Sequence, residues 1–111
     1  TEHTEKLFNQ SVFQDMKKTA FLINTARGAL IEDEDLIKAI QNKDIAGAAI
    51  DVFDEEPPPL NHPLIRVSLH NLIITPHIAW AAVEARQRAL QCIAENIDAF
   101  LNDRPINVVN A

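Results

Sequence analysis

The sequence has few of the residues that small proteins use to supplement an aliphatic core. Its single cysteine, Cys92, excludes a disulfide framework within the chain and is typical of a reducing compartment. It has no tyrosine, one tryptophan and five phenylalanines, so the core must consist mainly of Ile, Leu, Val and Ala. Cys92 falls within a helical pattern, and we interpret it as a core residue rather than a nucleophile.

Long apolar runs and an excess of basic charge are also missing. No apolar run approaches the length of a membrane span, and no signal-peptide pattern opens the chain. The net charge of −6, from 10 basic and 16 acidic residues, argues against a nucleic-acid partner. With 47% hydrophobic and 23% charged residues, the 111-residue chain has the balance of a globular domain. We therefore expect a cytoplasmic protein with neither a membrane nor a nucleic-acid partner.

Hydrophobic periodicity predicts alternating strands and helices. A short helix is expected over residues 10–18, with Ser11 as its N-cap, and another from the acidic residues 32–34 to about Asn42. Short apolar runs predict strands at 19–25, 44–53 and 71–75, and the proline-rich residues 54–63 predict a loop. A long helix is expected over 82–102, followed by an extended tail at 106–110. Small residues around Gly47 indicate close packing of a helix or ligand.

This order of elements predicts an α/β domain with a parallel sheet. In such sheets, ligands bind at the carboxyl ends of the strands. Four polar residues fall there: Arg27 after the first strand, Asp51 and Glu56 after the second, and His77 after the third. Each alone has an ordinary explanation, as a surface arginine, a turn aspartate, a solvated glutamate or a structural histidine. Their shared edge favours a common site.

The four side chains suit acid–base chemistry on a carbonyl. A histidine transfers protons near neutral pH, and a carboxylate bonded to its far nitrogen fixes its tautomer. Glu56 is a candidate for that carboxylate beside His77. The fork of Arg27 matches a substrate carboxylate or carbonyl oxygen. Together they suit the reversible reduction of a 2-oxo acid.

Three segments, "LINTARGALIEDEDLIKAI", "IAGAAIDVFDEEP" and "NLIITPHIAW", together resemble the C-terminal half of the D-isomer-specific 2-hydroxyacid dehydrogenases. The resemblance implies the C-terminal half of a Rossmann-like, doubly wound parallel sheet in residues 1–81. It also implies that residues 82–111 form an interdomain helix and tail that pack on a substrate domain and are apolar and exposed without it. It assigns catalysis to Arg27, Glu56 and His77, with Glu55 as the alternative to Glu56.

The resemblance further implies a nicotinamide cofactor, NAD or NADP, that exchanges a hydride with C2 of the substrate. Asp51 would hydrogen-bond the nicotinamide carboxamide. The residues expected to border the cofactor are Thr25, Ala26, Arg27, Asp51, His77, Ile78, Ala79 and Trp80. Gly28 and Gly47 are the only glycines, and no G-x-G-x-x-G phosphate-binding turn occurs. We therefore expect this chain to hold only the nicotinamide half and to be inactive alone, within a homodimeric full-length enzyme.

Several alternatives remain open. Within the family, "TPHIAWAAVEARQR" and "NVVN" most resemble glycerate dehydrogenases, also called hydroxypyruvate reductases, and D-lactate and phosphoglycerate dehydrogenases are the alternatives. Transcriptional corepressors of the same fold share the Arg, Glu and His residues and represent a binding function. A metal site built from His3, His62, His70 and His77 is not predicted, because the chain has no i, i+4 histidine pair and no C-x-x-C.

Overall fold

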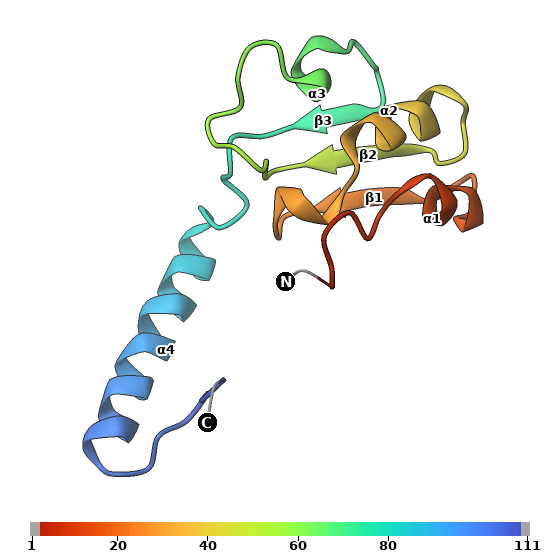
Figure 1. Ribbon diagram of the computed structural model, residues 1–111. Coiled ribbons are helices and arrows are strands. Elements are labelled where there is room, and N and C mark those ends of the chain that lie inside the picture. The colour runs from red at the N-terminus through yellow and green to blue at the C-terminus, as the bar shows by residue number, and fades with distance from the viewer. Residues whose placement is uncertain (1–2, 110–111) are drawn as a thin grey trace. The chain divides into compact units, whose positions relative to one another are not determined.

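A parallel three-stranded sheet organises the part of the chain before Ala79. The computed structural model describes residues 3–109, and its sheet comprises β1 (Phe21–Asn24), β2 (Gly47–Ile50) and β3 (Leu72–Ile74) in the order β1-β2-β3 (Figure 1). Leu22 pairs with Ala48, and Ile50 pairs with Ile74. The predicted α/β class with parallel strands is confirmed. Each strand is shorter than predicted, because its predicted ends lie in the connecting turns.

Three helices cover one face of this sheet. They are α1 (Gln10–Asp15), α2 (Asp33–Gln41) and α3 (Pro63–Arg66), and a 3-10 turn, η1 (Gly28–Leu30), precedes α2. The core between helices and sheet comprises Phe13, Leu22, Ile31, Leu36, Ala39, Ile40, Ile45, Ala48, Ile50 and Leu64. Aliphatic side chains therefore supply nearly all of this core, as the scarcity of aromatic residues predicts.

Two helices differ from the sequence-based expectation. Helix α1 ends at Asp15 rather than 18, and Ser11 is not its N-cap. Asn9 is the N-cap, because its side-chain oxygen accepts a hydrogen bond from the Ser11 N–H at 3.2 Å. Helix α3 follows the proline-rich loop where no helix is predicted. Pro63 is the first residue of this helix. The His62 side chain caps the helix, because its Nδ1 accepts a hydrogen bond from the Leu64 N–H.

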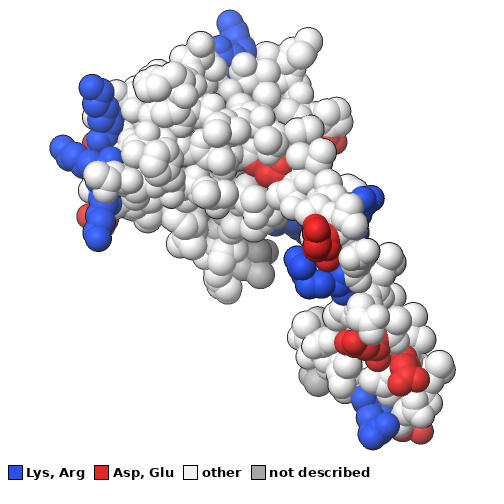
Figure 2. All heavy atoms as spheres, turned by 180° about the vertical axis from the view of Figure 1, so that it is seen from behind, with Lys and Arg blue, Asp and Glu red and all other residues white. Residues whose placement is uncertain are grey.

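The opposite face of the sheet is exposed. Phe21, Ile23 and Ile73 are 66%, 69% and 62% exposed, whereas Leu22 and Asn24 on the other face of β1 are buried and Leu72 and Ile74 on the other face of β3 are partly buried. In the view turned by 180° from that of Figure 1, the unit that contains the sheet has a broad surface with few charged side chains (Figure 2). In a doubly wound sheet, helices cover both faces. Among the described residues, helices cover only one face of this sheet.

Residues from Ala79 onward form a second compact unit. Its helix α4 (Val83–Leu101) has no buried residue, which agrees with the expected exposed apolar face. The interpretation of Cys92 as a core residue is wrong: it is exposed, and its sulfur contacts the side-chain amides of Asn96 and Asn107 at 3.9 and 3.8 Å. No strand forms in the described part of the predicted tail, and residue 110 lies outside the described residues.

The contacts divide the chain after Ile78, close to the boundary expected between residues 81 and 82. The assignment of these two segments to a cofactor domain and to a substrate-domain interface stays a prediction. None of the helices formed by residues 3–109 is both long and apolar enough to span a membrane.

Both glycines lie where other backbone passes closely. A Cβ at Gly28 would collide with the backbone of Phe53 and Asp54, and one at Gly47 would collide with the carbonyl oxygen of Asn71. Neither glycine has a positive φ. The close neighbour of Gly47 is thus Asn71, the residue before β3, and not a helix. At Gly28, the close neighbour is the chain segment that leads from β2 to Glu56.

We predict that Gly28→Ala lowers the free energy of unfolding by about 1–3 kcal/mol, because the new methyl group must push Phe53 and Asp54 away. Urea denaturation followed by circular dichroism measures this loss. Ala29→Ser, at the adjacent exposed position, is the control and should leave the denaturation midpoint unchanged. An unchanged midpoint for Gly28→Ala would show that this close approach does not exist.

Candidate active site

Asn24, the last residue of β1, shapes the loop that carries Arg27. Although polar, Asn24 is only 6% exposed. Its Nδ2 donates to the Arg27 carbonyl oxygen at 2.8 Å, and its Oδ1 accepts the Ala26 N–H at 3.1 Å. Sequence reasoning missed this role, although a polar residue on the buried face of an apolar strand is a usable signal. Asn24 therefore fixes the backbone from which Arg27 extends.

Asp51 directly follows β2 and is 4% exposed. Its Oδ1 accepts hydrogen bonds from the Thr75 hydroxyl and from the Ile78 N–H, the latter at 2.9 Å. Its own carbonyl oxygen accepts the His77 N–H at 2.9 Å. Asp51 thus joins the end of β2 to the turn that follows β3.

His77 lies in that turn and contacts Glu56. Its φ of 52° is in the left-handed region, which histidine tolerates better than most residues but which is still disfavoured. Its Nδ1 lies 2.7 Å from Glu56 Oε2, while Glu56 Oε1 accepts the Phe53 N–H at 2.9 Å. Both carboxylate oxygens of Glu56 are therefore engaged, one by a side chain and one by the backbone.

This bonding stabilises the ionised form of Glu56. The hydrogen bond from His77 lowers the pKa of Glu56 below its usual value, and the bond from the Phe53 N–H and the charge of Arg27 lower it further. Since the carboxylate can only accept, His77 Nδ1 must donate to it. Glu55, the alternative to Glu56 in the sequence, is exposed, and it is Glu56 that pairs with His77.

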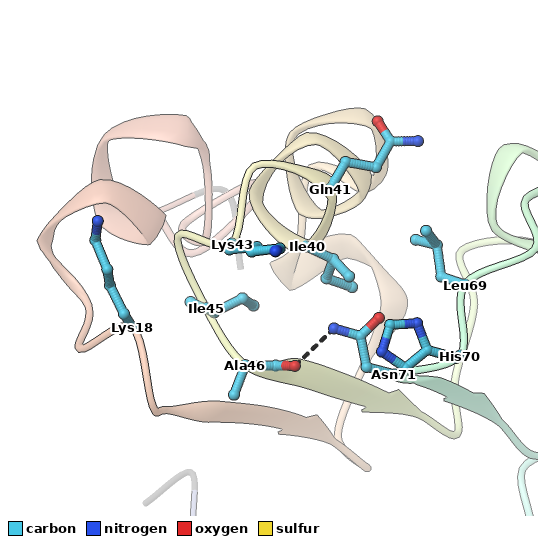
Figure 3. A pocket seen from close by; sticks show the side chains of 9 residues that line it. All are labelled: Lys18, Ile40, Gln41, Lys43, Ile45, Ala46, Leu69, His70 and Asn71. Carbon is cyan, nitrogen blue, oxygen red and sulfur yellow. Dashed lines mark hydrogen bonds between the residues drawn. The ribbon is translucent and has the colours of Figure 1, made fainter.

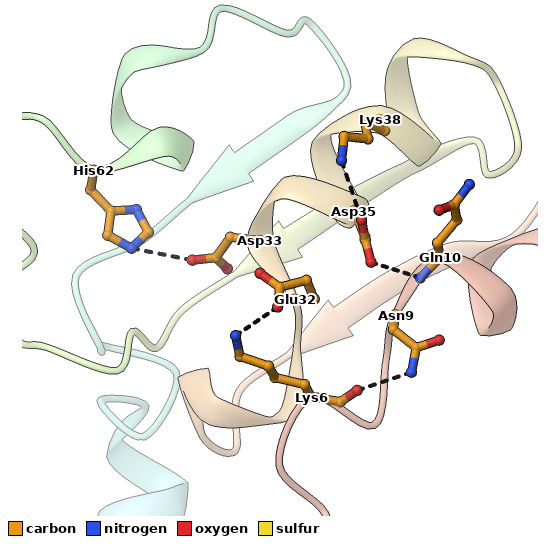
Figure 4. Close-up of polar contacts among 8 residues, drawn as sticks. All are labelled: Lys6, Asn9, Gln10, Glu32, Asp33, Asp35, Lys38 and His62. Atoms are coloured by element: carbon orange, nitrogen blue, oxygen red, sulfur yellow. Dashed lines mark hydrogen bonds and ion pairs between the residues drawn. The ribbon is translucent and has the colours of Figure 1, made fainter.

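The loop that carries Glu56 is braced against the helices. The rings of Phe53 and His62 meet edge to face with centroids 5.1 Å apart. His62 Nε2 lies 3.2 Å from Asp33 Oδ2 at the start of α2 (Figure 4). Burial raises the pKa of Asp33 above its usual value, and the attraction of His62 opposes that effect. Nearby, Lys6 pairs with Glu32 at 2.7 Å in the same cluster of polar contacts.

A cavity of about 310 Å³ lies at the carboxyl ends of the strands. Its lining residues are Asp51, Phe53, Glu56, Pro57, Pro76 and His77. Arg27 borders an adjacent hollow of about 290 Å³ that shares Phe53 with it. Thr25 and Ala26 line a third one, of about 190 Å³. The structure thus gathers Asp51, Glu56 and His77 around one cavity, and places Arg27 on the next.

The remaining predicted cofactor residues lie on either side of the unit boundary. Ile78 is half exposed and bonds Asp51 through its N–H. Ala79 and Trp80 belong to the second unit. Their contact with a cofactor stays a prediction.

His62 and His70 belong to other clusters of residues than His77. His62 pairs with Asp33, whereas His70 borders a separate cavity of about 490 Å³ at the amino ends of the strands (Figure 3). There the Asn71 amide donates to the Ala46 carbonyl oxygen at 2.6 Å. Across residues 3–109, no group of three or more His, Cys, Asp or Glu side chains is arranged to hold a metal ion.

With this geometry established, comparison with known proteins identifies the family. Residues 1–79 match the family described as the NAD binding domain of D-isomer specific 2-hydroxyacid dehydrogenases. The chain belongs to this family. It is 48% identical to a glyoxylate reductase of Thermofilum pendens, across 99% of this chain and 32% of that protein. It is 40% identical to a glycerate dehydrogenase of Methylorubrum extorquens, across 100% of this chain and 35% of that protein. The chain therefore spans about a third of the length of these relatives.

Solved structures agree on the fold. A D-isomer specific 2-hydroxyacid dehydrogenase of Xanthobacter autotrophicus, in complex with NADPH and MES, superposes with a TM-score of 0.78. It is 34% identical, over 99% of this chain and 44% of that one. An acyclic imino acid reductase in complex with NADPH and D-Arg has a TM-score of 0.80 at 33% identity, over 99% of this chain and 34% of that one. The expected Rossmann-like fold is confirmed.

The Glu56–His77 pair predicts a specific pH dependence. Because the pKa of Glu56 is lowered by folding, its contribution to stability is present above its ordinary pKa and is lost as the pH falls through the lowered value. ¹³C NMR titration of the Glu56 carboxyl group measures that value. His77→Gln should move it up toward the ordinary glutamate value.

Glu55→Gln is the matched control, because it removes the adjacent carboxylate without touching the pair. It should leave the Glu56 titration unchanged. If His77→Gln leaves the Glu56 pKa where it is in the wild-type chain, the hydrogen bond between them is not the cause of the shift.

Proposed function

We propose that the full-length protein reduces a 2-oxo acid to a D-2-hydroxy acid with NADH or NADPH. The observation that carries the proposal is the 2.7 Å contact between His77 Nδ1 and Glu56 Oε2 at the carboxyl ends of the strands. There, an ionised carboxylate holds an imidazole beside a cavity. Membership of the 2-hydroxyacid dehydrogenase family supports this chemistry over binding alone.

The donor set fits the nicotinamide half of the cofactor. Asp51 provides a buried carboxylate that can accept a hydrogen bond from a carboxamide, as the resemblance implies. Thr25, Ala26, Arg27 and the segment from His77 to Trp80 would border the ring. The chain has no G-x-G-x-x-G turn, so the proposal assigns it no part of the phosphate site.

When bound, the reduced nicotinamide supplies the hydride that reaches C2 of the substrate. His77 delivers a proton to the carbonyl oxygen, so that the C=O group becomes CH–OH, and takes it back in the reverse reaction. Glu56 holds the Nδ1 proton, fixes the tautomer and balances the charge of the imidazolium. Arg27 binds the substrate carboxylate and polarises its carbonyl.

The names of the relatives favour short 2-oxo acids. Beside the glyoxylate reductase and the glycerate dehydrogenase, a hydroxypyruvate reductase of Blautia hydrogenotrophica is 38% identical over 96% of this chain and 33% of that protein. We therefore propose glyoxylate and hydroxypyruvate as substrates. Pyruvate, the substrate of the alternative D-lactate activity, serves as the comparison.

In the full-length protein, we predict reduction of glyoxylate or hydroxypyruvate with NADH or NADPH, measured by loss of absorbance at the reduced nicotinamide band. His77→Asn should lower kcat by about 10²–10⁴-fold, because the proton donor is lost. The 111-residue chain alone should show no turnover.

His70→Asn is the matched control, because His70 lies beside the cavity at the other end of the strands. It should keep wild-type activity. Near-normal turnover of His77→Asn would refute the catalytic assignment. A wild-type protein that reduces neither acid but binds a peptide would favour the corepressor-like alternative.

A further inference from the structure

Thr75 follows β3 and lies two residues before His77. Its hydroxyl donates a hydrogen bond to Asp51 Oδ1, and its N–H donates to the Ile50 carbonyl oxygen at 3.0 Å. Thr75 is therefore tied to the end of β2 through both its side chain and its backbone. The proposed reaction assigns no role to this residue.

The same Asp51 oxygen receives bonds from both sides of His77. Oδ1 accepts the Thr75 hydroxyl on one side and the Ile78 N–H on the other, while the Asp51 carbonyl oxygen accepts the His77 N–H. Donors from three of four consecutive residues thus converge on one buried aspartate. Hydrogen bonds to a buried carboxylate are stronger than those between neutral groups, so they fix the turn firmly.

The backbone of His77 needs such support. Its left-handed φ of 52° is maintained only where the surroundings hold it. The direction of the imidazole follows from that backbone, and with it the 2.7 Å contact to Glu56. If the carboxylate of Asp51 rotates, the Ile78 N–H loses its acceptor and the turn gains other conformations.

We propose that Thr75 is a positioning residue: its hydroxyl orients the Asp51 carboxylate, which holds the 75–78 turn in the form that keeps His77 against Glu56. Thr75 acts through Asp51 and touches no reactant. The inference deepens the proposed function, on which it rests only for its effect on catalysis.

Thr75→Val in the 111-residue chain tests the proposal, since valine keeps the shape of threonine and removes the hydroxyl. Two measurements distinguish the positioning of His77 from a general loss of stability: amide hydrogen exchange at Ile78 and ¹³C titration of Glu56. We expect exchange at Ile78 to accelerate by about tenfold. The pKa of Glu56 should rise toward its value in His77→Gln. Thr75→Ser, which keeps the hydroxyl, should restore both readouts.

Thr19→Val is the matched control, because Thr19 is exposed before the amino end of β1. It should leave both readouts as in the wild-type chain. If Thr75→Val fails to fold, Thr75→Ala replaces it in the comparison with Thr75→Ser. Folded variants without the hydroxyl that match the wild-type chain in both readouts would overturn the proposal.

In the full-length protein, Thr75→Val should lower kcat about tenfold without changing the KM for the 2-oxo acid, because Arg27 is untouched. Thr75→Ser should recover the rate. If the proposed function fails, the wild-type protein reduces no 2-oxo acid, yet both NMR readouts still respond to Thr75→Val. If instead the wild-type protein is active and Thr75→Val matches it in kcat and in both NMR readouts, the role of Thr75 is refuted.

Discussion

The arrangement of the site depends on the hydrogen bonds that Asp51 accepts at the end of β2. The Asp51 carboxylate accepts hydrogen bonds from the Thr75 hydroxyl and the Ile78 N–H, and its carbonyl oxygen accepts one from the His77 N–H. The parallel sheet makes this possible, because it ends β2 and β3 side by side. These bonds help to hold His77 at a positive φ, with its Nδ1 against Glu56.

Two further constraints bring the remaining groups to the same edge. The side chain of Asn24, the last residue of β1, forms hydrogen bonds with the Ala26 N–H and with the Arg27 carbonyl oxygen. The Asp51 N–H donates to the Asn24 carbonyl oxygen at 3.0 Å. The loop that carries Glu56 passes so close to Gly28 that no side chain fits there. Each strand is thus followed or ended by one polar residue that shapes the backbone and is followed by one that is proposed to take part in catalysis.

The sequence predicts the fold class, the parallel strands and the polar residues at the strand ends, because hydrophobic periodicity and the positions of prolines and helix-capping residues report on local structure. It did not predict the supporting residues. Asn24 and Thr75 look like ordinary strand-end residues until their partners, which are distant or bent back in space, are known. The sequence predicts a buried Cys92 because the residue falls in an apolar helical pattern, yet it is exposed. An apolar helix pattern shows that a face needs cover, but α4 has no buried residue among the described contacts.

The proposed chemistry requires that Glu56 fixes the tautomer of His77, so that Nε2 transfers the proton. Long-range ¹H–¹⁵N NMR of the imidazole, at a pH where the ring is neutral, tests this most directly. We expect the proton to reside on Nδ1, where it is donated to Glu56, and Glu56→Gln to weaken this preference. A neutral ring with its proton on Nε2 would refute this role of Glu56.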